Sequence, residues 1–107
     1  MSRIVMKFGG TSVGSVERIN HVADIVRSEV DAKNQVVVVL SAMAGETDRL
    51  VNLTKDLSKD FSASEYDVII SSGEQVSVGA LSGLLNSLGV KSQSLLGWQV
   101  PIMTSSD

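Results

Sequence analysis

The stretch IVMKFGGTSV at residues 4–13 constrains the fold of this chain more than any other. A short apolar run ends in two glycines and two hydroxyl residues, and a helical pattern follows. A strand that runs through a glycine-rich turn into a helix gathers backbone N–H groups and the positive end of a helix dipole at one point, which suits an anion. Lys7 adds a full positive charge at the end of the strand. The alternative is a tight turn whose glycines only permit positive φ angles, with Lys7 solvated at an exposed strand end.

A strand–helix–strand unit is predicted around this turn. Residues 4–8 and 36–40 are short apolar runs, typical of strands that are buried in a parallel sheet. Between them, apolar residues recur at three- and four-residue spacing from residue 16 to 30, which predicts an amphipathic helix with Ser15 as its N-cap. Such a unit is right-handed, so its two strands are expected to run parallel.

The second strand also ends in small and hydroxyl residues, from Ser41 to Thr47. In open α/β sheets, ligands bind beyond the carboxyl ends of the strands. Both polar turns are therefore expected to open on the same edge of the sheet, and this convergence favours a binding site there.

Two further helices are expected in the middle of the chain. The first is indicated by the helical spacing of Leu50, Leu53, Leu57 and Phe61. For the second, a capping box at residues 64–67 precedes the apolar triplet at 68–70. Periodicity alone fits a strand equally well at that triplet, and the capping box favours a helix.

Residues 71–74, SSGE, are expected to interrupt this pattern. They would place Glu74 at the head of a last helix, whose apolar stripe runs from residue 76 to 88 and which ends at Gly89. A carboxylate at a helix head could be there for the helix dipole alone. The end of the chain predicts short strands at residues 92–96 and 100–104, around a packed or rim Trp98, and Pro101 indicates an edge position for the second.

Composition excludes several classes of function. The chain has no cysteine, which rules out disulfides, zinc–thiolate sites and thiol catalysis. Its single histidine, His21, falls on the polar side of the first helix and is assigned no role. A formal net charge of −3 does not fit a nucleic-acid-binding surface. We expect no membrane-spanning stretch and no signal peptide, and hence a cytoplasmic protein.

The glycine-rich turn differs from the two common nucleotide-binding loops. Gly9 and Gly14 have Walker A spacing, but Ser15 stands where that loop has lysine, and no G-x-G-x-x-G is present. Lys7 lies upstream on the strand, from where it could reach over the loop to a phosphate. This arrangement favours phosphoryl transfer, in which catalysis is mainly positioning and charge neutralisation.

Three motifs carry a resemblance to a known family. KFGGTSV at residues 7–13 resembles the N-terminal signature of aspartate kinases, in the amino-acid kinase superfamily. SAM at 41–43 followed by TDRL at 47–50 resembles their second loop, and SGE at 72–74 resembles their third motif. The resemblance runs over the whole chain, with the motifs in the right order.

The resemblance implies a three-layer αβα sandwich with a mostly parallel sheet, incomplete at its C-terminal side. Residues 1–107 would be the N-terminal portion of the kinase domain, the half that binds phosphate and the amino acid. The second half of that domain and the regulatory ACT domains are expected to be absent. Such a fragment is expected to be inactive alone, and to form a homo-oligomer or associate with the missing part of the kinase.

The implied activity is the phosphorylation of the side-chain carboxylate of L-aspartate by ATP, giving 4-phospho-L-aspartate on the way to lysine, threonine and methionine. By resemblance, Lys7 contacts the transferring phosphoryl group, and Phe8, Gly9 and Gly10 complete the ATP phosphate site. Mg²⁺ would arrive with the nucleotide, with no metal ligands from this chain. The amino-acid site would be lined by Ser41, Thr47 and Glu74.

Two alternatives stay open at this point. One is a kinase of the same fold for glutamate, acetylglutamate or a nucleoside monophosphate. The other is a non-catalytic binding or assembly module that uses the same half-fold to hold an anion or a partner chain.

Overall fold

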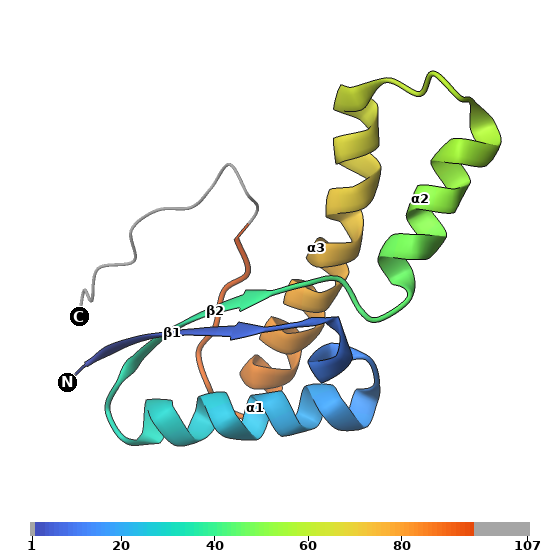
Figure 1. Ribbon diagram of the computed structural model, residues 1–107. Coiled ribbons are helices and arrows are strands. Elements are labelled where there is room, and N and C mark those ends of the chain that lie inside the picture. The colour runs from blue at the N-terminus through green and yellow to red at the C-terminus, as the bar shows by residue number, and fades with distance from the viewer. Residues whose placement is uncertain (1, 96–107) are drawn as a thin grey trace.

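The computed structural model describes residues 2–95. Figure 1 shows two neighbouring strands, a helix lying along them, and a helical hairpin that rises away from the sheet. In chain order the elements are β1 (Arg3–Phe8), the 3₁₀ helix η1 (Gly10–Val13), α1 (Val16–Asp31), β2 (Gln35–Leu40), α2 (Glu46–Leu57) and α3 (Ala63–Ser87).

The predicted strand–helix–strand unit is confirmed. β1 and β2 pair in parallel, in a register that sets Arg3 beside Gln35 and Phe8 beside Leu40. The side chain of Ser15 caps α1, because its Oγ accepts a hydrogen bond from the Arg18 amide at 3.2 Å. The carboxyl ends of both strands therefore lie at one edge of the sheet.

A single apolar cluster lies on one face of the two-stranded sheet. Alternate strand residues point into it, and α1 and α3 pack against one another and against β2 over them. Its buried members are Val13, Ile19, Val22, Ala23, Val26, Leu40, Leu81 and Leu85, with Met6, Phe8, Val36 and Val38 packed against them. The opposite face is open in the described structure, with Val5 67% exposed and Val39 46% exposed. This parallel sheet with packed helices fits the expected αβα class as a part of that fold.

The expected interruption at residues 71–74 is wrong, because α3 runs unbroken through them. The hydroxyls of Ser71 and Ser72 donate to carbonyl oxygens three residues earlier, at 3.0 and 2.6 Å, and so need no break in the helix. Gly73 is buried, and tertiary packing outweighs its weak helix propensity. Glu74 therefore lies in the middle of α3 and not at a helix head.

The bounds of the helical hairpin also differ from expectation. The helix at 68–70 is confirmed, but α3 begins at Ala63, one residue before the predicted box, with Ser62 as an N-cap that makes no side-chain cap bond. α2 ends at Leu57, so Phe61 lies in the connection between α2 and α3. The prediction for Gly89 is confirmed: its φ is 86°, and its amide donates to the Asn86 carbonyl at 3.1 Å, closing the end of α3.

The strand expected at residues 92–96 does not form in its described part. The Ser92 amide donates to Asn86 Oδ1 at 2.8 Å, and the Ser92 and Ser82 hydroxyls are 3.1 Å apart, so side chains of α3 take the bonds that a sheet neighbour would use. Residue 96, Trp98, and the strand expected at 100–104 with Pro101 lie outside the described residues.

The expectation that no stretch could span a bilayer needs a correction. Among residues 2–95, α3 is long and apolar enough to cross a membrane by length and composition, with a mean hydropathy of 1.3 over its best window. The core helix of a soluble protein, which is mostly buried, passes the same test, whereas 22% of this stretch of α3 is buried in the described structure. Its buried residues, among them Leu81 and Leu85, pack into the shared cluster with α1 and β2.

Candidate functional site

The first loop follows β1 directly and leaves amide groups unused. After Phe8 the chain turns at Gly9 into η1, where the Ser12 amide donates to the Gly9 carbonyl at 3.1 Å. The amides of Gly9, Gly10 and Thr11 donate to no backbone acceptor within residues 2–95. Gly9 is exposed, and a Cβ placed there would meet nothing within 4 Å. A group of free N–H donors on an open surface is suited to a phosphate.

The second loop, residues 41–45, lies against the first. The Ser41 amide donates to the Phe8 carbonyl at 3.2 Å, and the Ala44 amide donates to the Gly10 carbonyl at 3.1 Å. A Cβ on Gly10 would lie 2.7 Å from the Ala42 carbonyl oxygen, so the two backbones approach as closely as a glycine permits. This confirms the prediction that both polar turns open on one edge of the sheet.

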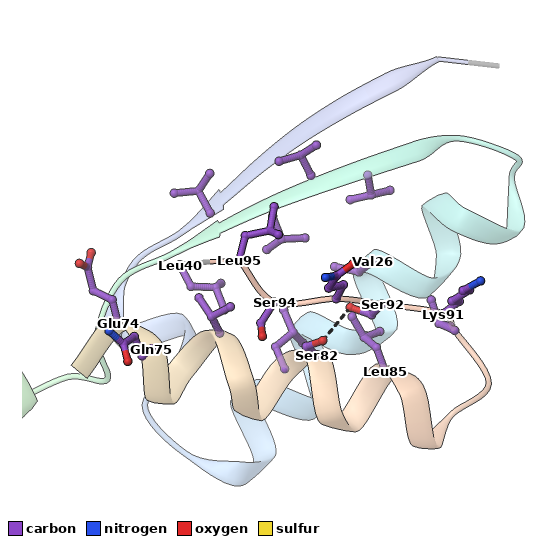
Figure 2. A pocket seen from close by; sticks show the side chains of 18 of the residues that line it. Val26, Leu40, Glu74, Gln75, Ser82, Leu85, Lys91, Ser92, Ser94 and Leu95 are labelled. Atoms are coloured by element: carbon purple, nitrogen blue, oxygen red, sulfur yellow. Dashed lines mark hydrogen bonds between the residues drawn. The ribbon is translucent and has the colours of Figure 1, made fainter. Parts of the chain in front are cut away.

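The middle of α3 closes the site from a third side. A Cβ on Gly73 would lie 3.0 Å from Ala42 Cβ and 3.6 Å from Glu46 Cγ, at the start of α2. Glu74 follows, exposed, and lies at one end of a groove of about 550 Å³ beside β2. Figure 2 shows Glu74 beyond Leu40, where the strand leads into the second loop.

The residues predicted to bind phosphate have different surroundings, because side chains alternate between the two faces of a strand. Lys7 is exposed on the open face of the sheet, beside Val39 in the register, while Phe8 points into the apolar cluster. Phe8 can therefore offer a phosphate only its backbone. Gly9 and Gly10 lie directly beyond, in the first loop.

The predicted amino-acid residues come from three elements. Ser41 is half-buried at the start of the second loop, Thr47 is exposed in the first turn of α2, and Glu74 is exposed on α3. Within the described part of the chain, the side chains of Lys7, Ser41, Thr47 and Glu74 take part in no hydrogen bond or ion pair. The described fold therefore uses none of these four side chains in its own polar contacts.

Sequence reasoning missed an ion pair beside the second loop. Arg49 Nε donates to both carboxylate oxygens of Glu46, at 3.1 and 3.2 Å. The hydrogen bond from Arg49 lowers the pKa of Glu46, desolvation opposes this, and the positive charge of Arg49 lowers the pKa further; Glu46 in turn raises the pKa of Arg49. The E-x-x-R spacing at a helix start is the signal that could have found it.

No grouping of three or more His, Asp or Glu side chains that could hold a metal ion occurs within residues 2–95.

A lysine-bearing strand, a first loop whose amides have no backbone acceptor among residues 2–95, and a second loop at the carboxyl edge of a parallel sheet define an α/β protein. The sequence model of the amino acid kinase family matches residues 2–106, and the chain belongs to that family.

Three similar proteins show which members of the family this chain resembles. The chain is 55% identical over 104 residues to the aspartokinase of Geobacillus stearothermophilus, covering 97% of this chain and 26% of that protein. It is 55% identical over 108 residues to the aspartate kinase of Pseudomonas fluorescens, covering 99% and 26%. The crystal structure of the aspartate kinase from Synechocystis superposes with a TM-score of 0.77 at 48% identity, covering 80% of this chain and 15% of that one. The chain thus spans about a quarter of the length of the curated relatives it matches.

Proposed function

We propose that this chain is the N-terminal, phosphate- and aspartate-binding portion of an aspartate kinase. The whole enzyme transfers the γ-phosphoryl group of ATP to the side-chain carboxylate of L-aspartate and forms 4-phospho-L-aspartate. The observation that carries the proposal is the contact of the first loop, the second loop and the middle of α3 at one sheet edge. The aspartate kinases among its relatives support the choice of substrate.

The ATP phosphates would bind at the first loop. The free amides of Gly9 and Gly10 can donate to phosphate oxygens, and the Lys7 ammonium is available on the adjoining strand. Donors that are already in place when negative charge develops stabilise the transition state of phosphoryl transfer. Mg²⁺ carried by the nucleotide would neutralise further phosphate charge.

L-Aspartate would bind between the second loop and α3. The Glu74 carboxylate has no partner in residues 2–95 and can hold the substrate ammonium group. The hydroxyls of Ser41 and Thr47 can orient a carboxylate, and Thr47 lies in the first turn of α2, where the helix dipole favours negative charge.

The biological setting follows from this activity. An aspartate kinase supplies the biosynthesis of lysine, threonine and methionine, and we infer a cytoplasmic location for it. The exposed apolar surfaces of the chain favour association, either between copies or with the remainder of the kinase domain.

A segment exchange tests the proposal directly. The matching 104-residue segment of the Geobacillus stearothermophilus aspartokinase is replaced by its counterpart from this chain, and ATP-dependent acyl phosphate is trapped with hydroxylamine. We expect aspartyl hydroxamate with L-aspartate and little product with L-glutamate or acetylglutamate. The exposed Lys55→Ala variant of the chimera is the control for surface charge. A folded chimera without aspartate activity, or with a preference for another acceptor, would reject the proposed function.

A further inference from the structure

Ala42 lies at the one point where both loops and α3 touch. It is 6% exposed, in the middle of the second loop. On one side, a Cβ on Gly10 would lie 2.7 Å from the Ala42 carbonyl oxygen and 3.2 Å from the Ala44 amide nitrogen. On the other side, a Cβ on Gly73 would lie 3.0 Å from the Ala42 side chain. Ala42 therefore contacts two glycines, Gly10 and Gly73, at which an added side chain would be crowded.

Close approach, and not backbone conformation, explains the glycine at 73. Its φ is not positive, and it lies inside a helix, where glycine is less favourable than alanine. Gly79 and Gly83 lie on the same helix, and a Cβ on either would meet nothing within 4 Å. The missing side chain at Gly73 therefore has a local consequence that the other two glycines lack.

We propose that Ala42 is a positioning residue, which holds the phosphate loop and the Glu74-bearing stretch of α3 at the separation that aspartate phosphorylation needs. Gly10 belongs to the first loop, whose amides are free of backbone acceptors among residues 2–95, and Gly73 is followed directly by Glu74. A change of a few tenths of an ångström at Ala42 changes the distance between donor and acceptor sites. This inference rests on the proposed function for its kinetic consequence alone.

The kinetic test uses Gly73→Ala in the chimera with the Geobacillus stearothermophilus aspartokinase. The new methyl group meets Ala42 Cβ at 3.0 Å, which is tighter than most real Cβ contacts, so the second loop must move from α3 by a few tenths of an ångström. A misplacement of about 1 Å can cost 10²-fold in rate, so we expect a loss of about tenfold in kcat/KM for aspartate. The KM for ATP should change less than twofold, because the substitution removes none of the donors proposed for the ATP phosphates.

A second substitution separates positioning from general damage. Ala42→Gly removes the side chain that Gly73→Ala would strike, so the double variant should recover at least half of the parental kcat/KM. Gly10→Ala should show no such rescue by Ala42→Gly, because its nearest atom is the Ala42 backbone carbonyl oxygen. Gly79→Ala and Gly83→Ala are matched controls on the same helix. We expect both to keep the parental kinetic constants and a Tm no lower than that of the parental chimera.

A readout independent of kinase activity comes from the Ala44 amide, which donates to the Gly10 carbonyl at 3.1 Å. Gly73→Ala should speed hydrogen exchange at this amide at least severalfold, and Ala42→Gly should restore it. An inactive parental chimera would reject the proposed function. The hydrogen-exchange measurement at Ala44 would still test the contact of Ala42 with Gly73. Four results would each overturn the positioning role. In Gly73→Ala, kcat/KM could stay at the parental value, or fall only in proportion to the folded fraction. Ala42→Gly could fail to rescue the activity, or hydrogen exchange at the Ala44 amide could stay unchanged.

Discussion

Lys7 and Phe8 are adjacent residues of β1 with opposite surroundings. Because side chains alternate along a strand, Phe8 packs into the apolar cluster while Lys7 stays on the open face. The sequence motif names both residues as phosphate contacts, but strand geometry leaves only the Lys7 side chain for that role. The proposed phosphoryl chemistry therefore depends most on the ammonium group of Lys7.

Lys7→Ala in the chimera is expected to lower kcat by about 10²–10³-fold, the usual loss when a preorganised charge-stabilising donor is removed. Lys7→Arg should also be poor, because a planar guanidinium does not replace a compact ammonium. Steady-state kinetics by hydroxamate trapping measures both, with Lys55→Ala as the control for charge. Near-parental kcat in Lys7→Ala would remove Lys7 from the reaction.

The structure removes the alternative explanation of Glu74 as a carboxylate placed at a helix head for the dipole. In the middle of α3 it is too far from the helix start to serve the dipole, so a role in capping no longer accounts for it. Glu74→Gln keeps the shape and removes the charge, and we expect the KM for aspartate to rise at least tenfold with the KM for ATP within twofold. Glu65→Gln, a carboxylate in the first turn of α3, is the matched variant and should affect thermal stability only. Equal effects of the two variants on KM would refute a contact between Glu74 and substrate.

At the scale of elements, local patterns predicted the strands and helices and failed where packing decides. The β-branched run of β2 and the Ser15 cap of α1 are local signals, and both predictions were confirmed. The SSGE segment looks like a break because serine and glycine have low helix propensity. Contacts with the second loop and bonds to neighbouring carbonyls override that propensity, and neither is visible in sequence spacing. The contact of Ala42 with Gly10 and Gly73 was missed for the same reason, although Ala42 lies in the SAM motif at residues 41–43.

The Glu46–Arg49 pair at the start of α2 predicts a pH dependence. Arg49 lowers the pKa of Glu46, so the pair contributes stability above the unfolded pKa of the carboxyl group, and this contribution is lost as the pH falls through the folded pKa. Arg49→Ala should raise the pKa of Glu46 toward its ordinary value and flatten the acid limb of the stability curve. Carboxyl ¹³C NMR titration with urea unfolding at several pH values measures both, and Arg27→Ala is the control. An unchanged Glu46 titration in Arg49→Ala would show that the pair does not form in solution.

At the scale of the whole molecule, sequence reasoning predicted that the two polar turns meet at one edge of the sheet, because parallel strands bring their carboxyl ends together. It did not predict how the third motif reaches that edge. Gly73 and Glu74 arrive on the flank of a continuous helix, and this placement depends on the packing of α3 against α1 and the second loop. Long-range contacts of that kind have no counterpart in local periodicity.

The 107-residue chain by itself is expected to have no measurable kinase turnover. It spans about a quarter of the length of its curated relatives, and the orientation of both reactants can be worth about 7–11 kcal/mol in favourable cases. We expect Lys7 and the amides of the first loop to bind an anion weakly without orienting both substrates.

Self-association of the same chain is expected from its exposed apolar surfaces. The open sheet face exposes Val5 and Val39, the groove lies along β2, and Leu57 is 64% exposed on α2. Uncovered strands and apolar faces of this kind pair with other chains. Light scattering should show oligomers, and Val5→Thr with Val39→Thr, which keeps β-branched residues while adding hydroxyls, should shift the population toward monomer. A monodisperse monomer that forms aspartyl hydroxamate with ATP would contradict both expectations, because it would show that residues 1–107 hold a complete and fully covered catalytic unit.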